Sequence, residues 1–419
     1  MREKYEYLII GAGISGIAMA RLLQLSGVRS FAVREAAAEA GGLCRTRKIG
    51  GHYLDVGGGH FLCTKHEAVY DFIFAHCPRS EFNYYDRVSK IRIGGTEIDY
   101  PLESNIWQLA TEECREFLLS IVRNGEARGL PAPSDFEGWL RWKLGDRVTD
   151  DYMIPYNRKI WGVEPSELDI DWLSKIPRLK VNEIVDSCLR RQATKNKMPS
   201  HEGFFYPRHG GFQTIIDALL APVAGHVCYA SPASRLEQEG DGILVDGKYL
   251  VRKIIVTVPW QTLGDSPMMP AEVKSAIGGL RHNSLQVSLH EEDYRTDAHW
   301  TYVPDENIAA HREFFIHNFA PHSDVRGLYR ETNVKRWDCA TPSLYSHCNQ
   351  FAYPIPVLNW ARTIQGVLDW GRQHNIHGLG RWGQWQYFNS DVCIHQAMRL
   401  AEELGHTSWK QNLGIDGRC

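Results

Sequence analysis

The sequence lacks the closely spaced cysteines and histidines that hold structural metals. Its 10 cysteines include no C-x-x-C pair, and neither H-E-x-x-H nor the D-x-D-x-D-G calcium loop occurs. Zinc modules and disulfide scaffolds both need such spacing, so both classes are excluded and no metal site is expected. The cysteine pattern instead predicts a reduced, cytoplasmic protein.

Charge of one sign and long hydrophobic runs are also scarce. The 47 Lys and Arg balance 50 Asp and Glu, which argues against nucleic acid as a partner. Glycines and Arg21 interrupt the first apolar run, 8–25, so no membrane span is expected. With 419 residues the chain is too long for one compact core and suits two or three domains. Whether it forms a homo-oligomer stays open.

The first 35 residues alternate between strand and helix patterns. Residues 5–10 and 31–33 are short β-rich runs, and residues 14–24 between them place apolar side chains at helical spacing. A strand, a helix and a second strand in this order begin a doubly wound parallel sheet. The pattern predicts an α/β fold that opens with a Rossmann-type unit.

A G-x-G-x-x-G motif joins the first strand to the helix. Gly11 permits the tight turn, Gly13 lets the backbone approach a diphosphate, and Gly16 lets helix and strand pack closely. The helix N-terminus offers free N–H groups to the phosphates. Glu35 ends the second strand, where a carboxylate accepts hydrogen bonds from ribose hydroxyls. These features predict a dinucleotide site.

A second glycine stretch favours FAD over NAD. Residues 41–47 (GGLCRTR) and 53–60 (YLDVGGGH) resemble the second glycine stretch of flavin-dependent amine-oxidase-like enzymes, as do 257–259 (TVP) and 380–383 (GRWG). FAD is longer than NAD, and glycines supply backbone clearance along it. The cofactor-binding residues predicted in this way are Gly11, Gly13, Ile14, Ser15, Gly16, Glu35, Gly42, Leu43, Arg45, Gly58, Gly59, Gly380, Arg381 and Asp391.

Further stretches resemble the UDP-galactopyranose mutase family, and its eukaryotic-type members most closely. In family order they are 100–105 (YPLESN), 155–161 (PYNRKIW), 204–211 (FFYPRHGG), 299–307 (HWTYVPDEN), 312–321 (REFFIHNFAP), 353–354 (YP) and 380–387 (GRWGQWQY). No single stretch is specific. Their order and co-occurrence from residue 8 to about residue 400 carry the resemblance.

The resemblance implies roles for individual residues. Arg312, Tyr353 and Tyr387 match the family's diphosphate-binding positions, and His60 matches the histidine beside the flavin ring. The catalytic residues implied are therefore His60 and Arg312. The substrate-binding residues implied are Tyr100, Glu103, Asn157, Trp161, Arg178, His201, Trp300, Tyr302, Tyr353 and Tyr387.

The family's chemistry is an isomerisation without net redox change. By resemblance, N5 of a reduced FAD attacks the anomeric carbon of a nucleotide sugar and the nucleoside diphosphate leaves transiently. The adduct then opens and recloses through the other hydroxyl, which converts a pyranose into a furanose. NAD(P)H or another reductant would supply the electrons.

Four positions depart from the family pattern. The second diphosphate arginine is replaced by Ile176, with Lys175 and Arg178 close by in the sequence. Glu103 stands where the family has glutamine. His201 replaces an asparagine of the eukaryotic-type enzymes, and Cys63 a histidine of the bacterial ones. The fold and the flavin site are still expected, but the sugar, the base and the reductant stay open.

Two other functions remain as alternatives. The first is an FAD-dependent oxidase or dehydrogenase of the amine-oxidase or protoporphyrinogen-oxidase type, although a phosphate clamp around Arg312 argues against it. The second is a non-catalytic binding protein. The predicted layout is an FAD-binding domain from 1–85, 202–265 and 371–419, a mainly helical insertion at 86–201, and a sheet substrate domain at 266–370.

Overall fold

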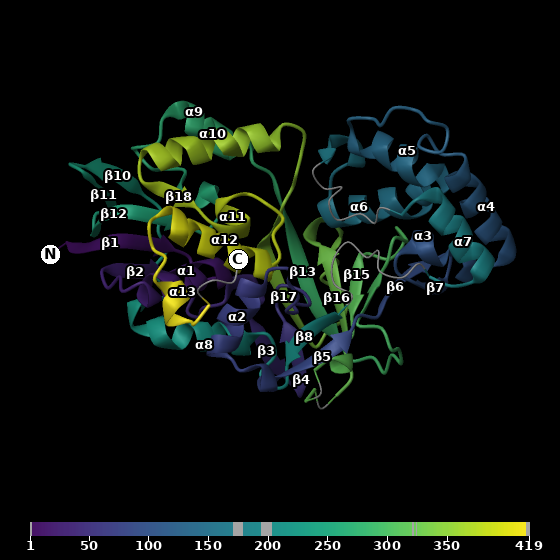
Figure 1. The fold of residues 1–419 in the computed structure, drawn as a ribbon, viewed down its shortest axis with the longest axis horizontal. Coiled ribbons are helices and arrows are strands. Elements are labelled where there is room, and N and C mark those ends of the chain that lie inside the picture. Colours follow the sequence, from purple (N-terminus) through teal and green to yellow (C-terminus); the bar gives the residue numbers. More distant parts are fainter. Residues whose placement is uncertain (1, 171–178, 194–202, 321, 324, 416–419) are drawn as a thin grey trace.

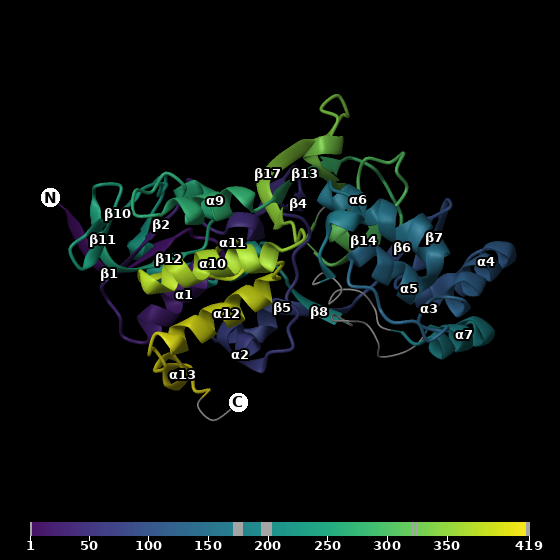
Figure 2. The same ribbon diagram turned by 90° about the horizontal axis from the view of Figure 1, so that it is seen from above.

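The computed structural model describes residues 2–170, 179–193, 203–320, 322–323 and 325–415. Three parts follow one another along the long axis of the molecule (Figures 1 and 2). A sheet with helices on both faces lies near the N-terminus, a second sheet lies in the middle, and helices α3 to α7 form the far end. The predicted α/β class, with a Rossmann-type domain, a helical insertion and a mixed sheet, is confirmed.

The first sheet contains the predicted strand–helix–strand unit. Strand β1 (Glu3–Ile10) pairs in parallel with β2 (Phe31–Arg34) on one side and β12 (Tyr249–Val256) on the other. The buried stretches 7–10 of β1 and 254–256 of β12 are apolar, as expected for strands of a parallel sheet with helices on both faces. The remaining strands of this sheet are β9 (Val227–Cys228), β10 (Leu236–Glu239), β11 (Gly242–Val245) and β18 (Ile376–Gly378).

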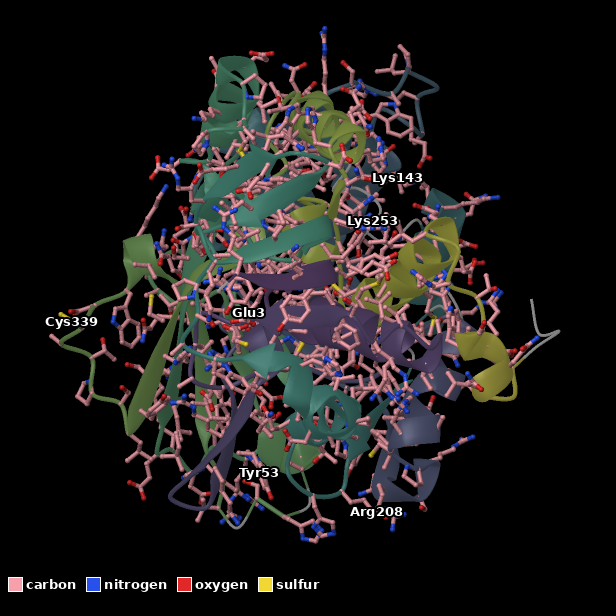
Figure 3. The ribbon with its side chains drawn as sticks, turned by 90° about the vertical axis from the view of Figure 1, so that its left-hand side faces the viewer. Glu3, Tyr53, Lys143, Arg208, Lys253 and Cys339 are labelled. Atoms are coloured by element: carbon pink, nitrogen blue, oxygen red, sulfur yellow. The ribbon has the colours of Figure 1, made fainter. Side chains whose placement is uncertain are left out.

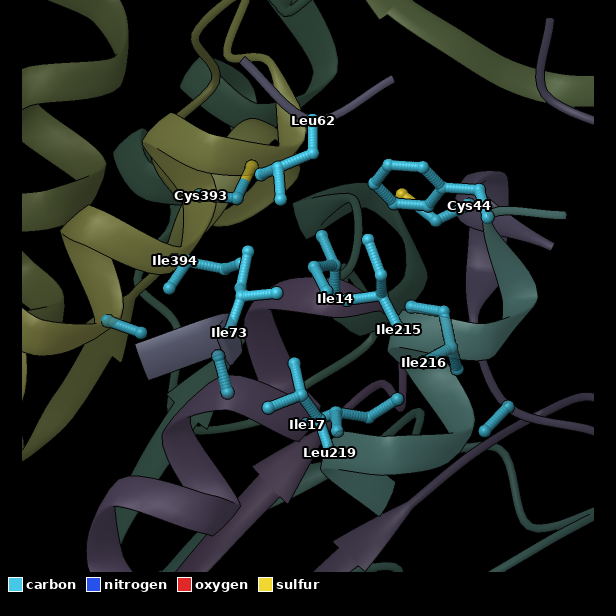
Figure 4. Close-up of a cluster of buried hydrophobic side chains, with 14 of the residues drawn as sticks. Ile14, Ile17, Cys44, Leu62, Ile73, Ile215, Ile216, Leu219, Cys393 and Ile394 are labelled. Carbon is cyan, nitrogen blue, oxygen red and sulfur yellow. The ribbon is translucent and has the colours of Figure 1, made fainter. Parts of the chain in front are cut away.

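Helix α1 (Ile14–Leu25) packs against α8 (Gln213–Leu220) and α12 (Ser390–Glu403), and α2 (Glu67–His76) contacts both of these. Figure 4 shows the core that these helices share, with Ile14 and Ile17 of α1 close to Ile215 and Leu219 of α8. Each fully buried aliphatic side chain of this kind contributes about 1.5–3 kcal/mol. The core fixes the start of α1, where the glycine motif lies.

The second sheet has the order β17-β13-β16-β15-β14-β6-β7. Its strands are β6 (Ser89–Ile93), β7 (Thr96–Asp99), β13 (His282–His290), β14 (Trp300–Tyr302), β15 (Arg312–Phe314), β16 (Leu328–Asn333) and β17 (Tyr345–Pro354). Its neighbouring strands are antiparallel except β6 and β14, which pair in parallel. Strands β6 and β7 precede the helices in sequence yet extend this sheet, which the sequence pattern does not indicate.

The helical part contains α3 (Leu102–Asn105), α4 (Thr111–Val122), α5 (Phe136–Val148), a π-helical turn (Thr149–Met153), α6 (Ile154–Trp161) and α7 (Val181–Arg190). Its apolar core is separate from that of the first sheet and includes Phe117, Leu140 and Trp161. Helix α5 is capped by Asp135, which accepts from the N–H of Gly138 at 2.7 Å.

The other elements are β3 (Thr46–Ile49) with β4 (His52–Asp55), β5 (Phe82–Asp86) with β8 (Gly203–Pro207), α9 (Ala271–Gly279), α10 (Trp360–Gln373), α11 (Gly380–Gly383) and α13 (Trp409–Asn412). Helices α9 and α10 pack on each other over the apolar core that includes β12 and β18. Among the described residues, every helix falls short of the length and hydrophobicity that a bilayer crossing requires.

Candidate functional site

Two of the three glycines in the motif, Gly11 and Gly16, occupy positions that other residues do not fit. Gly11 has a φ of +103°, and a Cβ at Gly16 would lie 1.9 Å from the carbonyl oxygen of Gly11. By contrast, a Cβ at Gly13 would meet no atom within 4 Å. Gly11 and Gly16 therefore hold the strand against the helix, while Gly13 leaves the backbone open to a ligand.

A cavity of about 350 Å³ opens in front of this turn. Glu35 lies in its wall and accepts hydrogen bonds from the backbone N–H groups of Ala12 at 2.7 Å and Ala37 at 2.8 Å. The predicted cofactor residues that line the cavity are Gly11, Gly13, Ile14, Ser15, Glu35, Gly42, Leu43, Arg45 and Arg381. The open backbone and the fixed carboxylate fit the diphosphate and ribose of a dinucleotide.

Three predicted glycines serve close packing. Besides Gly16, a Cβ at Gly380 would lie 2.0 Å from Oγ of Ser15, and one at Gly58 would lie 1.6 Å from Oε1 of Glu331. Any side chain at these positions would displace backbone or buried groups that shape the cavity walls.

Substitutions at Gly13 and Gly16 should distinguish an effect on the stability of the fold from an effect on cofactor binding. We expect Gly16→Ala to destabilise the cofactor-free protein by about 1–3 kcal/mol, because the added carbon overlaps a backbone carbonyl. Gly13→Ala should change stability by less than about 0.5 kcal/mol, yet lower the flavin content, because its methyl group occupies ligand space. Thermal unfolding and the flavin absorbance of purified protein measure the two effects. Equal behaviour of the two variants would contradict this assignment.

A second, smaller cavity continues from the first. It measures about 80 Å³, and the predicted residues Gly59, Arg312, Tyr353, Tyr387 and Asp391 are in its wall. His60, Arg381 and Ser390 line both cavities and therefore mark their junction. The structure thus brings together residues that the sequence places more than 300 positions apart.

Arg312 is held by a buried carboxylate. Its side chain, 17% exposed, donates to Oε2 of Glu331 from Nε at 2.9 Å and from Nη2 at 2.8 Å. Its Nη2 also lies 3.4 Å from the hydroxyl of Tyr353. Burial raises the pKa of Glu331, but the charge of Arg312 and the neighbouring His311, whose Nε2 lies 3.3 Å from Oε2, outweigh it and keep that pKa below its usual value.

The sequence motifs do not point to Glu331. It lies on β16, directly opposite Arg312 of β15 in the antiparallel register. This strand pairing places residues 19 positions apart opposite each other, and no local sequence pattern predicts which residues pair. Only the sheet identifies the partner of the predicted arginine.

His60 is a neutral imidazole at the junction of the cavities. Its Nδ1 lies 2.6 Å from the carbonyl oxygen of Gly58, which can only accept, so Nδ1 carries the proton. Burial, followed by the nearby charge of Arg381, lowers the pKa of His60 to about 4. Nε2 therefore keeps its lone pair and can accept a hydrogen bond from a ligand.

Aromatic rings surround the second cavity. The rings of Tyr353 and Tyr387 lie 4.9 Å apart, and Trp161, fully buried, contacts both at 6.1 and 6.2 Å between centroids. The guanidinium of Arg381 lies 5.1 and 5.3 Å from the centres of the two tyrosine rings. The wall of the cavity therefore includes two guanidinium groups and two phenols, together with the carboxylate of Asp391.

Arg87 is a cation that the motifs do not indicate. Its guanidinium lies 4.8 Å from the ring centre of Trp300 and 5.0 Å from that of Tyr100, and it donates to the hydroxyl of Tyr302 at 3.1 Å. Trp300 also stacks on Phe61, which lines the second cavity. Three predicted substrate residues thus surround a guanidinium beside the site.

The predicted base-side residues lie partly inside the helical part. Glu103 and Asn157 are 2% and 1% exposed. The side-chain N–H of Asn157 donates to the carbonyl oxygen of Met153, and its side-chain oxygen accepts from the indole N–H of Trp161. Burial raises the pKa of Glu103 to about 7. The predicted residues Arg178 and His201, with Lys175 and Ile176, lie outside the described residues.

Cys63, one of the departures from the family pattern, lines the second cavity. Burial raises the pKa of its thiol to about 11, so the side chain is a neutral thiol at physiological pH. Within the described ranges, no group of three or more His, Cys, Asp or Glu side chains is arranged to hold a metal ion.

Comparisons with known proteins agree with this geometry. Residues 9–74 match the family model described as an NAD(P)-binding Rossmann-like domain. A probable UDP-galactopyranose mutase of Klebsiella pneumoniae is 26% identical over 94% of both chains. A dTDP-fucopyranose mutase of Escherichia coli is 26% identical over 94% of this chain and 97% of its own.

Solved structures show the same fold. A reduced UDP-galactopyranose mutase superposes with a TM-score of 0.86 at 20% identity, covering 99% of this chain and 97% of its own. A redesigned putrescine oxidase gives a TM-score of 0.63 at 15% identity, covering 97% of this chain and all of its own. The resemblance to the UDP-galactopyranose mutase family, within a fold shared with amine oxidases, is therefore confirmed over nearly the whole chain.

Proposed function

We propose that the chain is a flavin-dependent mutase that interconverts the pyranose and furanose forms of a nucleotide sugar. One observation supports this proposal most strongly. The cavity that fits a dinucleotide adjoins a second cavity lined by Arg312, Tyr353 and Tyr387, and His60 and Arg381 line both. A dinucleotide fits the first cavity, and a diphosphate fits the donors of the second.

The relatives set the class of the reaction. Proteins that align with nearly the full chain act on UDP-galactopyranose or dTDP-fucopyranose, and both are mutases, a type of isomerase. The chain is accordingly an enzyme of the flavin-dependent mutase type. A nucleotide sugar is the substrate class that these relatives support.

The chain's own residues would hold FAD in the first cavity. The open turn at Gly13 would receive the diphosphate, Glu35 the ribose, and His60 with Arg381 would lie at the flavin end. Bound and reduced, the flavin supplies N5 as a nucleophile for the anomeric carbon.

The second cavity would stabilise the departing nucleoside diphosphate. Arg312 offers a planar guanidinium that Glu331 holds in place, and the hydroxyls of Tyr353 and Tyr387 add donors. Neutral His60 would accept a hydrogen bond without adding charge beside the sugar.

The departures leave the sugar and the base unassigned. Glu103 presents a carboxyl where the family has an amide, and Cys63 presents a neutral thiol at the second cavity. Relatives with different bases and sugars share the same degree of identity, so identity does not choose between them. Arg87 adds a guanidinium among the predicted substrate residues, which we propose as a further contact for an anionic ligand.

An assay of the reduced holoenzyme tests the function. We expect protein reduced once with dithionite to convert many equivalents of a pyranose nucleotide sugar, from a panel with different bases, into the furanose isomer. Oxidised protein should convert none. An oxidase would consume one equivalent of acceptor per product, and a non-catalytic binding protein would form no product; either result contradicts the proposal.

A further inference from the structure

A buried carboxylate holds the loop that carries His60. Residues 56–59, three of them glycines, join Asp55 at the end of β4 to His60 at the junction of the two cavities. Glycine restricts the backbone less than any other residue, so this loop keeps one conformation only where other groups hold it. The direction of the imidazole therefore depends on what fixes the loop.

Asp55 binds the loop at two points. Its carbonyl oxygen accepts from the N–H of Gly58 at 3.0 Å, and Oδ2 of its carboxylate accepts from the N–H of His60 at 3.2 Å. The imidazole is held in turn through Nδ1, which lies 2.6 Å from the carbonyl oxygen of Gly58. The main chain and the ring of His60 are thus each bound to a group that Asp55 fixes.

The carboxylate itself is held by hydroxyl groups. Oδ1 accepts from Oγ1 of Thr46 on β3 at 2.5 Å, and the hydroxyl of Tyr206 on β8 lies 3.3 Å from both oxygens. Asp55 is 1% exposed, and within the described ranges no Lys or Arg pairs with it. Burial of a charge without a counter-charge lowers stability, so folding alone does not favour a carboxylate at this position.

We propose that Asp55 is a positioning residue for His60, whose imidazole it fixes at the junction of the two cavities with Nε2 as a hydrogen-bond acceptor. The inference rests on the proposed function, in which His60 lies beside the flavin. Asp55 is not in the wall of either cavity, so it acts on a bound flavin through His60.

The same contact makes the position of His60 depend on pH. Burial raises the pKa of Asp55 to about 7, and its three hydrogen bonds lower it only in part. The titratable groups that face it are the phenols of Tyr206 and Tyr329 and the thiol of Cys44. Burial raises the pKa of each of these, so all three are neutral at physiological pH. Because a carboxylate accepts a hydrogen bond more strongly than the protonated acid does, His60 is held more firmly once Asp55 is ionised.

Nitrogen NMR of the imidazole in the holoenzyme tests the position of His60 directly. With isotope-labelled histidine, and with His60→Gln to assign the signal, we expect the unaltered protein to show one tautomer, protonated at Nδ1. Asp55→Ala should shift both ring nitrogens towards a mixture of tautomers. Asp55→Asn should restore the original signal, because its side-chain oxygen accepts from the same N–H. If Asp55→Ala leaves the His60 signal unchanged, Asp55 does not position the ring.

A pH titration of the unaltered protein provides a test that needs no variant to fold. The pKa of His60 is about 4, so its own ring does not titrate near neutral pH. We nevertheless expect its ring signals to shift as the pH passes through about 7, where Asp55 gains its proton. Asp55→Asn should abolish this shift. An unaltered protein whose His60 signals stay constant would contradict the proposal.

Affinity for FAD shows whether Asp55 acts through His60. Asp55→Ala and His60→Ala should each weaken FAD binding by about tenfold, the effect of one lost hydrogen bond. The double variant should also lose about tenfold rather than about a hundredfold, because Asp55 has nothing left to position once the imidazole is absent. Losses that multiply would show that the two residues act independently and would overturn the assignment.

Tyr53→Ala is the matched control for stability. It removes a buried ring two residues before Asp55, on the same face of β4 (Figure 3). We expect it to lower the midpoint of thermal unfolding but to leave the His60 signals and the affinity for FAD unchanged. None of these measurements uses a nucleotide sugar, so a failure of the proposed mutase reaction and a failure of the Asp55 assignment give different results.

Discussion

Replacement of Arg312 by alanine is expected to lower kcat for the nucleotide sugar by about 10²–10³-fold. The guanidinium lines the second cavity beside Tyr353 and is the cation that Glu331 fixes there. A positioned donor that meets developing charge in a water-poor site has an effect of about this size. Arg312→Lys should recover only part of the rate, because an ammonium lacks the planar fork. Initial rates with the reduced enzyme measure both variants.

Arg330→Ala is the matched control for Arg312. It changes an arginine on the neighbouring strand β16 whose guanidinium pairs with Glu292 and Glu313 instead of lining the cavity. We expect an unchanged kcat and an unchanged flavin spectrum. If Arg312→Ala keeps full activity with bound flavin, the clamp does not exist and the proposed function loses its support.

Replacement of Glu331 by alanine is expected to destabilise the protein by about 3–5 kcal/mol. Glu331 is fully buried, and its loss leaves the guanidinium of Arg312 buried without its counter-charge. Affinity for a nucleoside diphosphate should also change, because Arg312 then loses the ion pair that orients its guanidinium. Denaturant unfolding and UDP titration, monitored by flavin absorbance, provide the two measurements.

The control for Glu331 lies on the adjacent strand. Glu313 is similarly buried but pairs with Arg92 and Arg330, away from the cavities. Glu313→Ala should also destabilise the protein, yet leave UDP affinity unchanged. In the double variant Arg312→Ala/Glu331→Ala the two stability losses should be less than additive, since each alone leaves one buried charge unpaired. Additive losses would show that the pair is not coupled.

The same pair predicts a dependence of stability on pH. The folded-state pKa of Glu331 lies below its ordinary value, so the folded protein binds this proton less readily than the unfolded chain. The stabilisation is therefore present above the unfolded pKa and is lost as the pH falls through the folded value. Glu331→Gln should remove this contribution.

The glycine turn and the carboxylate that we propose for nucleotide binding were predictable because their sequence pattern is local. Gly11, Gly13 and Gly16 lie within six residues of one another, and Glu35 follows at the end of the next strand. Each of these positions meets a steric or hydrogen-bonding requirement of the turn itself. The pattern can therefore be recognised in the sequence without knowledge of the rest of the fold. The aromatic and arginine positions of the second cavity came only from resemblance to a family.

The sequence by itself determined the parts that local backbone geometry dictates: the strand–helix–strand opening, the turn that fits a diphosphate, and the absence of any C-x-x-C spacing. Tertiary structure alone decided which charges meet. Glu331 opposite Arg312, and Arg87 between Tyr100 and Trp300, come from strand register and packing between distant segments. Such contacts depend on how whole sheets and helices pack together, and this packing cannot be predicted from a residue's neighbours along the chain.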